Sequence, residues 1–234
     1  MILFSLLTAA IAPGLALLVY FYLKDRYDTE PIGSVARLFV IGLLIVFPIM
    51  VIQRGFVLGF GENPIMFSFG VSAGIEEFVK WFLVYYLIYR QGAIKHSYDA
   101  IVYATAISLG FATMENVIFS LYYEPSVQVL ITRALLPVSG HALFGVTMGY
   151  YLGKAMYHPL TEKRYLSYAL FMPIVWHGIY DYILLTASKQ WLWLIIPFMV
   201  WMWTRSLRKM NRARRMPVLA SHTQDNVNIT ESIS

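Results

Sequence analysis

The sequence predicts an all-α fold, a polytopic membrane helix bundle of about seven transmembrane helices. Its 234 residues are 59% hydrophobic and only 13% charged, whereas soluble domains carry about 25% charged residues. The apolar residues are gathered in stretches of the length that crosses a bilayer, about 20 residues each. The chain contains no cysteine, which excludes disulfides, a thiol nucleophile and a cysteine-based zinc site.

The predicted spans run roughly over 2–23, 35–53, 65–89, 99–122, 129–152, 166–187 and 190–204. No basic region precedes the first, and Lys24 follows it, so it is a span and not a typical cleavable signal peptide. The second, fifth and sixth contain Pro48, Pro137 and Pro173, which are tolerated where neighbouring helices satisfy the freed backbone. The third and fourth are apolar except at a few ionisable residues. The last is short, but its tryptophans suit anchoring at the membrane interface.

The basic residues outside the spans predict the orientation. The first, third and fifth loops and the tail carry 13 lysines and arginines, against two in the other loops. This places the amino terminus outside and the carboxyl terminus in the cytoplasm. Residues 1–204 then form the membrane domain, and 205–234 form a basic juxtamembrane segment and a disordered cytoplasmic tail. We expect the basic segment to face anionic lipid of the bilayer, and we expect no nucleic acid as a partner.

Ionisable residues inside the spans form the candidate functional site, because an acidic side chain at the centre of a span costs roughly 2.5–3.5 kcal/mol. Glu76 and Glu77 are adjacent in the third span, and Lys80 follows one turn later. At a rise of about 1.5 Å per residue, residues from four spans fall at one level, between the middle of the membrane and its outer third. The set is Glu76, Glu77, Lys80, Glu115, His141, His177 and Asp181.

This set permits general-base activation of water by a glutamate. His141 and His177 are suited to stabilise an oxyanion or protonate a leaving amine, and Asp181 is spaced to orient His177. Neither a G-x-S-x-G nor an H-E-x-x-H motif is present. We therefore expect water activation without a cofactor. Because His and Glu are common zinc ligands, a divalent metal held by Glu76, His141 and His177 is the alternative.

Four motifs, in this order, resemble the PrsW family of bacterial membrane proteases. They are Gly74-Ile75-Glu76-Glu77-Phe78-Val79-Lys80-Trp81, Leu109-Gly110-Phe111-Ala112-Thr113-Met114-Glu115-Asn116, Ser139-Gly140-His141-Ala142 and His177-Gly178-Ile179-Tyr180-Asp181. The juxtamembrane run 22–31 is similar too, so the likeness covers nearly the whole chain apart from the tail. A more distant likeness is to the CAAX-processing glutamyl membrane proteases. The chain departs from that pattern at Lys80, which stands three instead of four residues after the second glutamate, and at Pro137, which replaces an aromatic residue.

The resemblance implies a glutamic-type peptidase of the bacterial plasma membrane. Glu76 and Glu77 match the paired glutamates, His141 the middle histidine, and His177 with Asp181 the last motif. Members of the family are implicated in the first, site-1 cut of a single-pass anti-sigma factor, made on the extracytoplasmic side under envelope stress. A second protease then cuts within the membrane, and the sigma factor is released. The resemblance therefore implies an anti-sigma factor as the substrate.

Two other functions are compatible with seven spans. A proton-coupled carrier would use the buried acids and histidines as a relay, and it predicts a polar path to both faces, whereas the ionisable residues here cluster in the outer half. A seven-helix receptor shares the orientation. Its retinal-binding form needs a Schiff-base lysine that the last span lacks.

Overall fold

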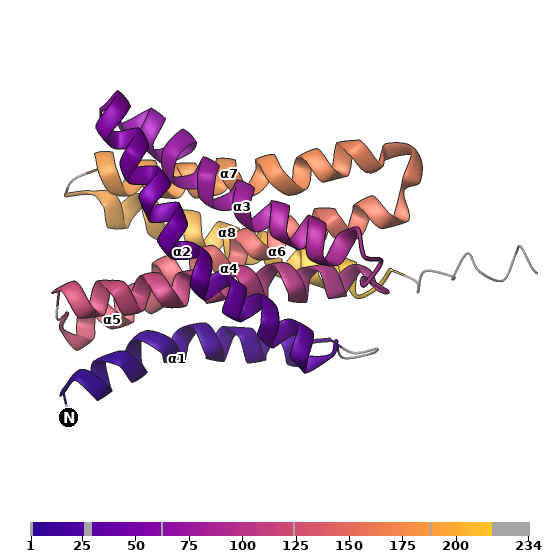
Figure 1. Ribbon diagram of the computed structural model, residues 1–234, viewed down its shortest axis with the longest axis horizontal. Coiled ribbons are helices and arrows are strands. Elements are labelled where there is room, and N and C mark those ends of the chain that lie inside the picture. The colour runs from indigo at the N-terminus through magenta and orange to yellow at the C-terminus, as the bar shows by residue number, and fades with distance from the viewer. Residues whose placement is uncertain (1, 26–29, 62, 124, 188, 217–234) are drawn as a thin grey trace, which may run out of the picture.

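The structure, a computed structural model, describes residues 2–25, 30–61, 63–123, 125–187 and 189–216. The tail predicted to be disordered lies, from residue 217 on, outside the described residues. The described chain folds into helices packed side by side (Figure 1). In chain order these are α1 (Ile2–Leu23), α2 (Ile32–Phe60), η1 (Met66–Ser72), α3 (Ala73–Val84), η2 (Tyr85–Tyr89), α4 (Ser97–Tyr123), α5 (Val127–Arg133), η3 (Ala134–Val138), α6 (Ser139–Tyr157), η4 (Pro159–Thr161), α7 (Glu162–Thr186) and α8 (Trp191–Ala213).

These elements join into segments that match the seven predicted spans, which confirms the all-α membrane bundle. Five segments are long and apolar enough to cross a membrane: Phe4–Leu23, Ile32–Phe60, Ser97–Tyr123, Val127–Tyr157 and Pro159–Thr186. The segment from η1 to η2 carries the charged residues of the candidate site, and α8 carries a basic last third. Both are therefore less apolar than the other five.

Helices α2 and α8 extend furthest beyond their predicted ends. The second span was predicted to end at residue 53, but α2 continues to Phe60 because apolar side chains such as Phe56 and Leu58 extend its lipid-facing surface. The last was predicted to end at residue 204, but α8 continues to Ala213. Its final turns are amphipathic, with Ser206 and Met210 buried while Arg208 and Arg212 are exposed.

Helix α4 forms the centre of the bundle, with α1, α2 and α6 packed around it. It is buried along most of its length, and glycines allow its neighbours to approach closely. A Cβ atom at Gly110 of α4 would lie 2.0 Å from the carbonyl oxygen of Phe39 in α2. A Cβ atom at Gly149 of α6 would lie 2.3 Å from the carbonyl oxygen of Ala100 in α4. Such small residues are typical of packed transmembrane helices.

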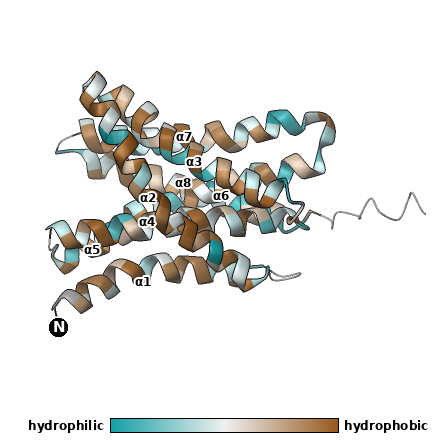
Figure 2. Cartoon of the chain, in the orientation of Figure 1, coloured by the Kyte–Doolittle hydropathy of each residue, from teal (hydrophilic) through white to brown (hydrophobic). Residues whose placement is uncertain are grey.

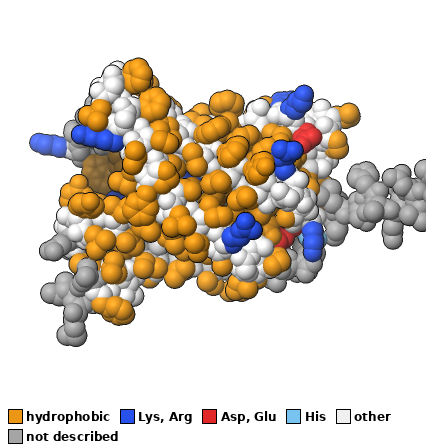
Figure 3. All heavy atoms as spheres, viewed as in Figure 1, with side chains coloured by type: hydrophobic (Ala, Val, Ile, Leu, Met, Phe, Trp, Pro, Cys, Tyr) orange, Lys and Arg blue, Asp and Glu red, His pale blue; other side chains and the backbone are white. Residues whose placement is uncertain are grey.

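The surface has the polarity expected of a membrane bundle. Hydrophobic residues dominate the middle of the helices (Figure 2), and hydrophobic side chains cover most of the visible face (Figure 3). Lysines and arginines lie toward the two ends of the bundle in that view. The apolar surface extends over α2, where Val40, Leu44 and Val51 are exposed. Because no water reaches the hydrocarbon layer, this surface suits contact with lipid chains.

Candidate functional site

The glutamate pair lies on α3, directly after the π-helical segment η1. In a π-helix the backbone hydrogen bonds join residues five apart, and such segments are frequent at functional sites. Glu76 and Glu77 are 4% and 0% exposed, and Lys80 on the same helix is also fully buried. The Lys80 Nζ atom lies 3.2 Å from Glu76 Oε2 and 2.9 Å from Glu77 Oε1. One ammonium group therefore neutralises part of the negative charge of both carboxylates.

Two histidines reach the same point from neighbouring helices. His141, in the first turn of α6, has its Nδ1 atom 3.2 Å from Lys80 Nζ and its Nε2 atom 2.9 Å from Glu115 Oε2 of α4. His177 of α7 has its Nδ1 atom 3.0 Å from Glu77 Oε1. The centres of the two imidazole rings are 5.0 Å apart. The structure thus brings together acids, histidines and a lysine from four helices, as the sequence predicted.

Asp181 lies next to His177, as the sequence spacing predicted. Its Oδ2 atom is 3.5 Å from His177 Nε2, and Glu77 Oε1 is 3.0 Å from the other ring nitrogen. Asp181 also accepts a hydrogen bond of 2.6 Å from the Ser72 hydroxyl in η1. The ring of His177 therefore lies between two carboxylates, and Asp181 also ties α7 to η1.

Two polar residues of the site were missed by sequence reasoning. Ser72 holds Asp181, and Gln53 of α2 donates a hydrogen bond of 3.1 Å to Glu76 Oε1. Gln53 also donates to the Val71 carbonyl oxygen at 3.4 Å. Neutral polar side chains near the ends of predicted spans are common, so neither residue carried a signal. Gln53 was predicted to be the last residue of the second span, whereas it lies inside α2, which continues to Phe60.

Aromatic rings surround the polar groups and fix the histidines. The ring of Phe144 stacks on His177 with centres 4.8 Å apart, and Lys80 Nζ lies 4.0 Å from the centre of the Phe111 ring. Next to His177, Gly178 leaves room for Phe69 of η1, since a Cβ atom there would lie 2.3 Å from that ring. These contacts hold α3, α6 and α7 at short distance and leave little freedom in the site.

The site is more open on the side of Glu115 and Asp181. Their side chains are 32% and 17% exposed, whereas those of Glu77 and Lys80 are 0% exposed. Beyond Glu115, Arg133 donates a hydrogen bond of 2.7 Å to Asn116 and lies over the ring of Phe119. Arg133 thus lies near the more open side of the site, tied to Asn116 and Phe119.

The side chains of the site include the types of ligand that bind divalent metal ions. Glu76, Glu77, His141 and His177 each offer a ligand atom, and these atoms all lie within 4.8 Å of one another. Carboxylate oxygens and imidazole nitrogens are common zinc ligands, and the buried Glu77 Oε2 atom has no hydrogen-bond partner. Relative to the set predicted for a metal-dependent site, the structure adds Glu77. Glu76, Glu77 and His141 also contact Lys80, whose ammonium group would have to move aside for an ion.

Comparisons with known proteins agree with this geometry. The family model described as "PrsW family intramembrane metalloprotease" matches residues 30–204. A protein named Protease PrsW from Halalkalibacterium halodurans is 44% identical over 91% of this chain and 99% of its own length. A protein of the same name from Geobacillus kaustophilus is 46% identical over 90% of this chain and 93% of its own length. The Bacillus subtilis protein of that name is 44% identical over 92% of this chain and 99% of its own.

No solved structure matches the chain. The matched region contains every residue of the candidate site, from Gln53 to Asp181. The family model covers most of the chain, and relatives of the same name match over nearly their whole lengths. The chain is therefore a multi-pass membrane peptidase that belongs to the PrsW family of intramembrane proteases.

Proposed function

We propose that the buried cluster of Glu76, Glu77, His141 and His177 is where this protease hydrolyses a peptide bond. The observation that carries the proposal is the convergence of two carboxylates and two imidazoles within 4.8 Å inside a membrane bundle. Burying such a cluster in a membrane is energetically costly, and ionisable residues at that depth usually mark a functional site. It also supplies both the base and the proton donors that hydrolysis requires.

The two glutamates differ in their surroundings, and this assigns them different roles. Glu77 is fully buried and held by Lys80 and His177, so it positions those two side chains. Glu76 is slightly exposed, and its Oε2 atom lies 4.0 Å from His177 Nε2. That separation is too long for a direct hydrogen bond but allows one water molecule to bridge both atoms. We assign Glu76 as the base that acts on this water.

The reaction can then be written with its protons balanced. Glu76 takes a proton from the water as its oxygen bonds to the carbonyl carbon of the substrate. The histidines and Lys80 lie close enough to stabilise the negative charge that develops on the carbonyl oxygen. As the carbon–nitrogen bond breaks, Glu76 returns the proton to the leaving amine. The products are a carboxylic acid and an amine. The acid proton then passes to the amine, so the products leave as a carboxylate and an ammonium group, and the site is ready for another water molecule.

A metal ion bound in the same cluster would assist the activation of water. Glu76, Glu77, His141 and His177 are the residues that would hold it. When bound, it would act as a Lewis acid and make the water more acidic. The name of the matching family includes "metalloprotease", and the donor set fits that description. We therefore propose a metal-dependent site in place of the metal-free one expected from the sequence motifs.

The proposed substrate is a single-pass anti-sigma factor, cut near its extracytoplasmic end to start release of a sigma factor. The likeness of the site motifs to the PrsW family supports this substrate. The predicted level of the cluster, between the middle of the membrane and its outer third, supports a cut toward the predicted outer side. A carrier function is disfavoured because the relatives are named proteases.

The position of the cut tests the proposed function. The purified chain would be reconstituted in liposomes with a single-pass anti-sigma factor, and the fragments would be identified by mass spectrometry. We expect one cut in the outer part of the substrate's span or just outside it. A cut in the cytoplasmic half, or equal cutting of an unrelated single-pass protein, would contradict the proposal.

A further inference from the structure

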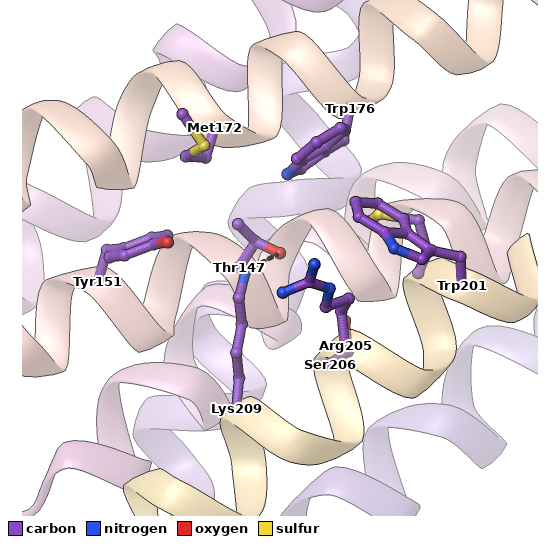
Figure 4. Close-up of a pocket in the computed structure, with 9 residues that line it drawn as sticks. Thr147, Tyr151, Met172, Trp176, Trp201, Arg205, Ser206 and Lys209 are labelled. Atoms are coloured by element: carbon purple, nitrogen blue, oxygen red, sulfur yellow. Dashed lines mark hydrogen bonds between the residues drawn. The ribbon is translucent and has the colours of Figure 1, made fainter. Parts of the chain in front are cut away.

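A cavity lies between α6, α7 and α8, apart from the residues of the candidate site (Figure 4). Its volume is about 180 Å³, room for roughly six water molecules at about 30 Å³ each. Two cations, two hydroxyl groups and two indole rings are prominent in its lining: Arg205, Lys209, Thr147, Ser206, Trp176 and Trp201. The lining therefore combines cations, hydroxyl groups and aromatic rings.

The direction of α8 explains why its cations enter the cavity. Arg205 and Lys209 are one turn apart and therefore lie on one face of the helix. Helix side chains tilt toward the amino terminus of their helix, which for α8 is the end away from the predicted cytoplasm. Lys209 accordingly reaches back into the bundle, where its Nζ atom donates a hydrogen bond of 3.0 Å to the Thr147 hydroxyl (Figure 4).

The cavity holds two cations that have no carboxylate partner. In the described part of the chain, neither Arg205 nor Lys209 forms an ion pair with a carboxylate. Arg205 lies over the Trp201 ring at 5.3 Å, and Lys209 lies 5.1 Å from the Tyr151 ring. The Ser206 hydroxyl is buried, lines the cavity and has no hydrogen-bond partner. Two unpaired cations and an unsatisfied hydroxyl together favour an anion with several oxygen atoms.

We propose that this cavity binds the phosphate group of an anionic phospholipid from the cytoplasmic leaflet. Lys209 lies about 27 Å along α8 from Trp191, at about 1.5 Å per residue, so the cavity falls in the predicted cytoplasmic half of the bundle. Basic pockets between transmembrane helices on that side bind acidic lipid head groups, and indole rings suit the adjoining interface. Arg205 and Lys209 would contact the phosphate, with the Thr147 and Ser206 hydroxyls completing its hydrogen bonds.

Native mass spectrometry of the full-length protein provides the test. The protein would be purified in mild detergent, and phosphatidylglycerol or phosphatidylcholine would be added in turn. The variants are Arg205→Gln and Lys209→Gln. The matched controls are Arg208→Gln and Arg212→Gln, which remove the same charge from exposed positions on α8 outside the cavity. Far-ultraviolet circular dichroism would check that each variant is folded.

We expect phosphatidylglycerol to bind the parent and both controls. Its apparent affinity should fall about tenfold for each cavity cation removed, because each removal loses one charge-assisted hydrogen bond. Equal losses in the controls would overturn the proposal, since they would indicate a general attraction to the basic helix. Equal binding of phosphatidylcholine would also overturn it. An excess of inorganic phosphate that displaces the lipid completely would show that the site takes a free anion, and so would contradict the lipid assignment.

Discussion

Replacing Lys80 with methionine tests the electrostatic balance of the candidate site. The change keeps most of the side-chain volume but removes the ammonium group that lies 2.9 Å from Glu77 and 3.2 Å from Glu76. At an effective dielectric constant of about 20, each of these contacts amounts to roughly 5 kcal/mol of Coulomb attraction. Part of that attraction offsets the cost of burying the charges. Breaking a buried ion pair by removing one partner typically costs about 3–5 kcal/mol of net stability.

The assay follows unfolding by circular dichroism while a denaturing detergent is titrated into the mild-detergent micelles. We expect Lys80→Met to lower the unfolding free energy by about 3–5 kcal/mol. Glu77→Gln added to this variant removes one of the two carboxylates that have lost the lysine ammonium group, so the double variant should recover roughly 2 kcal/mol. Lys163→Met, at an exposed position of α7, is the control and should change stability little.

The reasoning would be refuted by either of two results. A loss below about 1 kcal/mol for Lys80→Met would show that the glutamates do not depend on the lysine for neutralisation. Strict additivity of the Lys80 and Glu77 changes would show that the two side chains are not coupled in the folded protein.

Three further predictions concern the metal, a buried acid and the helix packing. A strong chelator should abolish cleavage and zinc should restore it, with metal content measured by mass spectrometry; persistent cleavage would instead favour water activation by the glutamates alone. Burial raises the pKa of Glu30, before α2, from 4.5 to about 7, so its ionised form is disfavoured in the folded protein. Relative to Glu30→Gln, the parent should therefore lose stability as the pH rises from about 4.5 to about 7 and then level off; a flat difference would contradict this. Gly149→Ala should destabilise the bundle by roughly 1–3 kcal/mol because its Cβ would meet the Ala100 backbone. Gly33→Ala is the control and should not destabilise it, because a Cβ there meets open space. Equal unfolding midpoints for the two variants would count against the close packing of α4 and α6.

The sequence was most informative where the physical cost of a residue is high. A charged residue in an apolar span stands out, so Glu76, Glu77 and Lys80 identified the site, and the helical rise placed His141 and His177 at the same level. The structure brings these residues together. Their roles in hydrolysis stay a prediction, as do the cofactor and the substrate.

Features that depend on contacts between helices could not be predicted in this way. Gln53 and Ser72 are neutral, and nothing in their local sequence distinguishes them from other polar residues near the end of a span. Their importance appears only when α2 and η1 are packed against Glu76 and Asp181. The ends of α2 and α8 were also missed. Helix α2 continues through exposed apolar residues to Phe60, and α8 continues through amphipathic turns to Ala213.

The central claim is that Glu76 acts as the base in peptide hydrolysis and that Glu77 holds Lys80 and His177 in position for it. The most direct measurement compares cleavage rates of the parent, Glu76→Gln and Glu77→Gln in liposomes under single-turnover conditions. Glu162→Gln is the matched control, because Glu162 pairs with Tyr89 outside the site. The account predicts that both site variants lose at least about a hundredfold in rate, while the control cleaves at the parent's rate. Cleavage by either site variant at the parent's rate would contradict it.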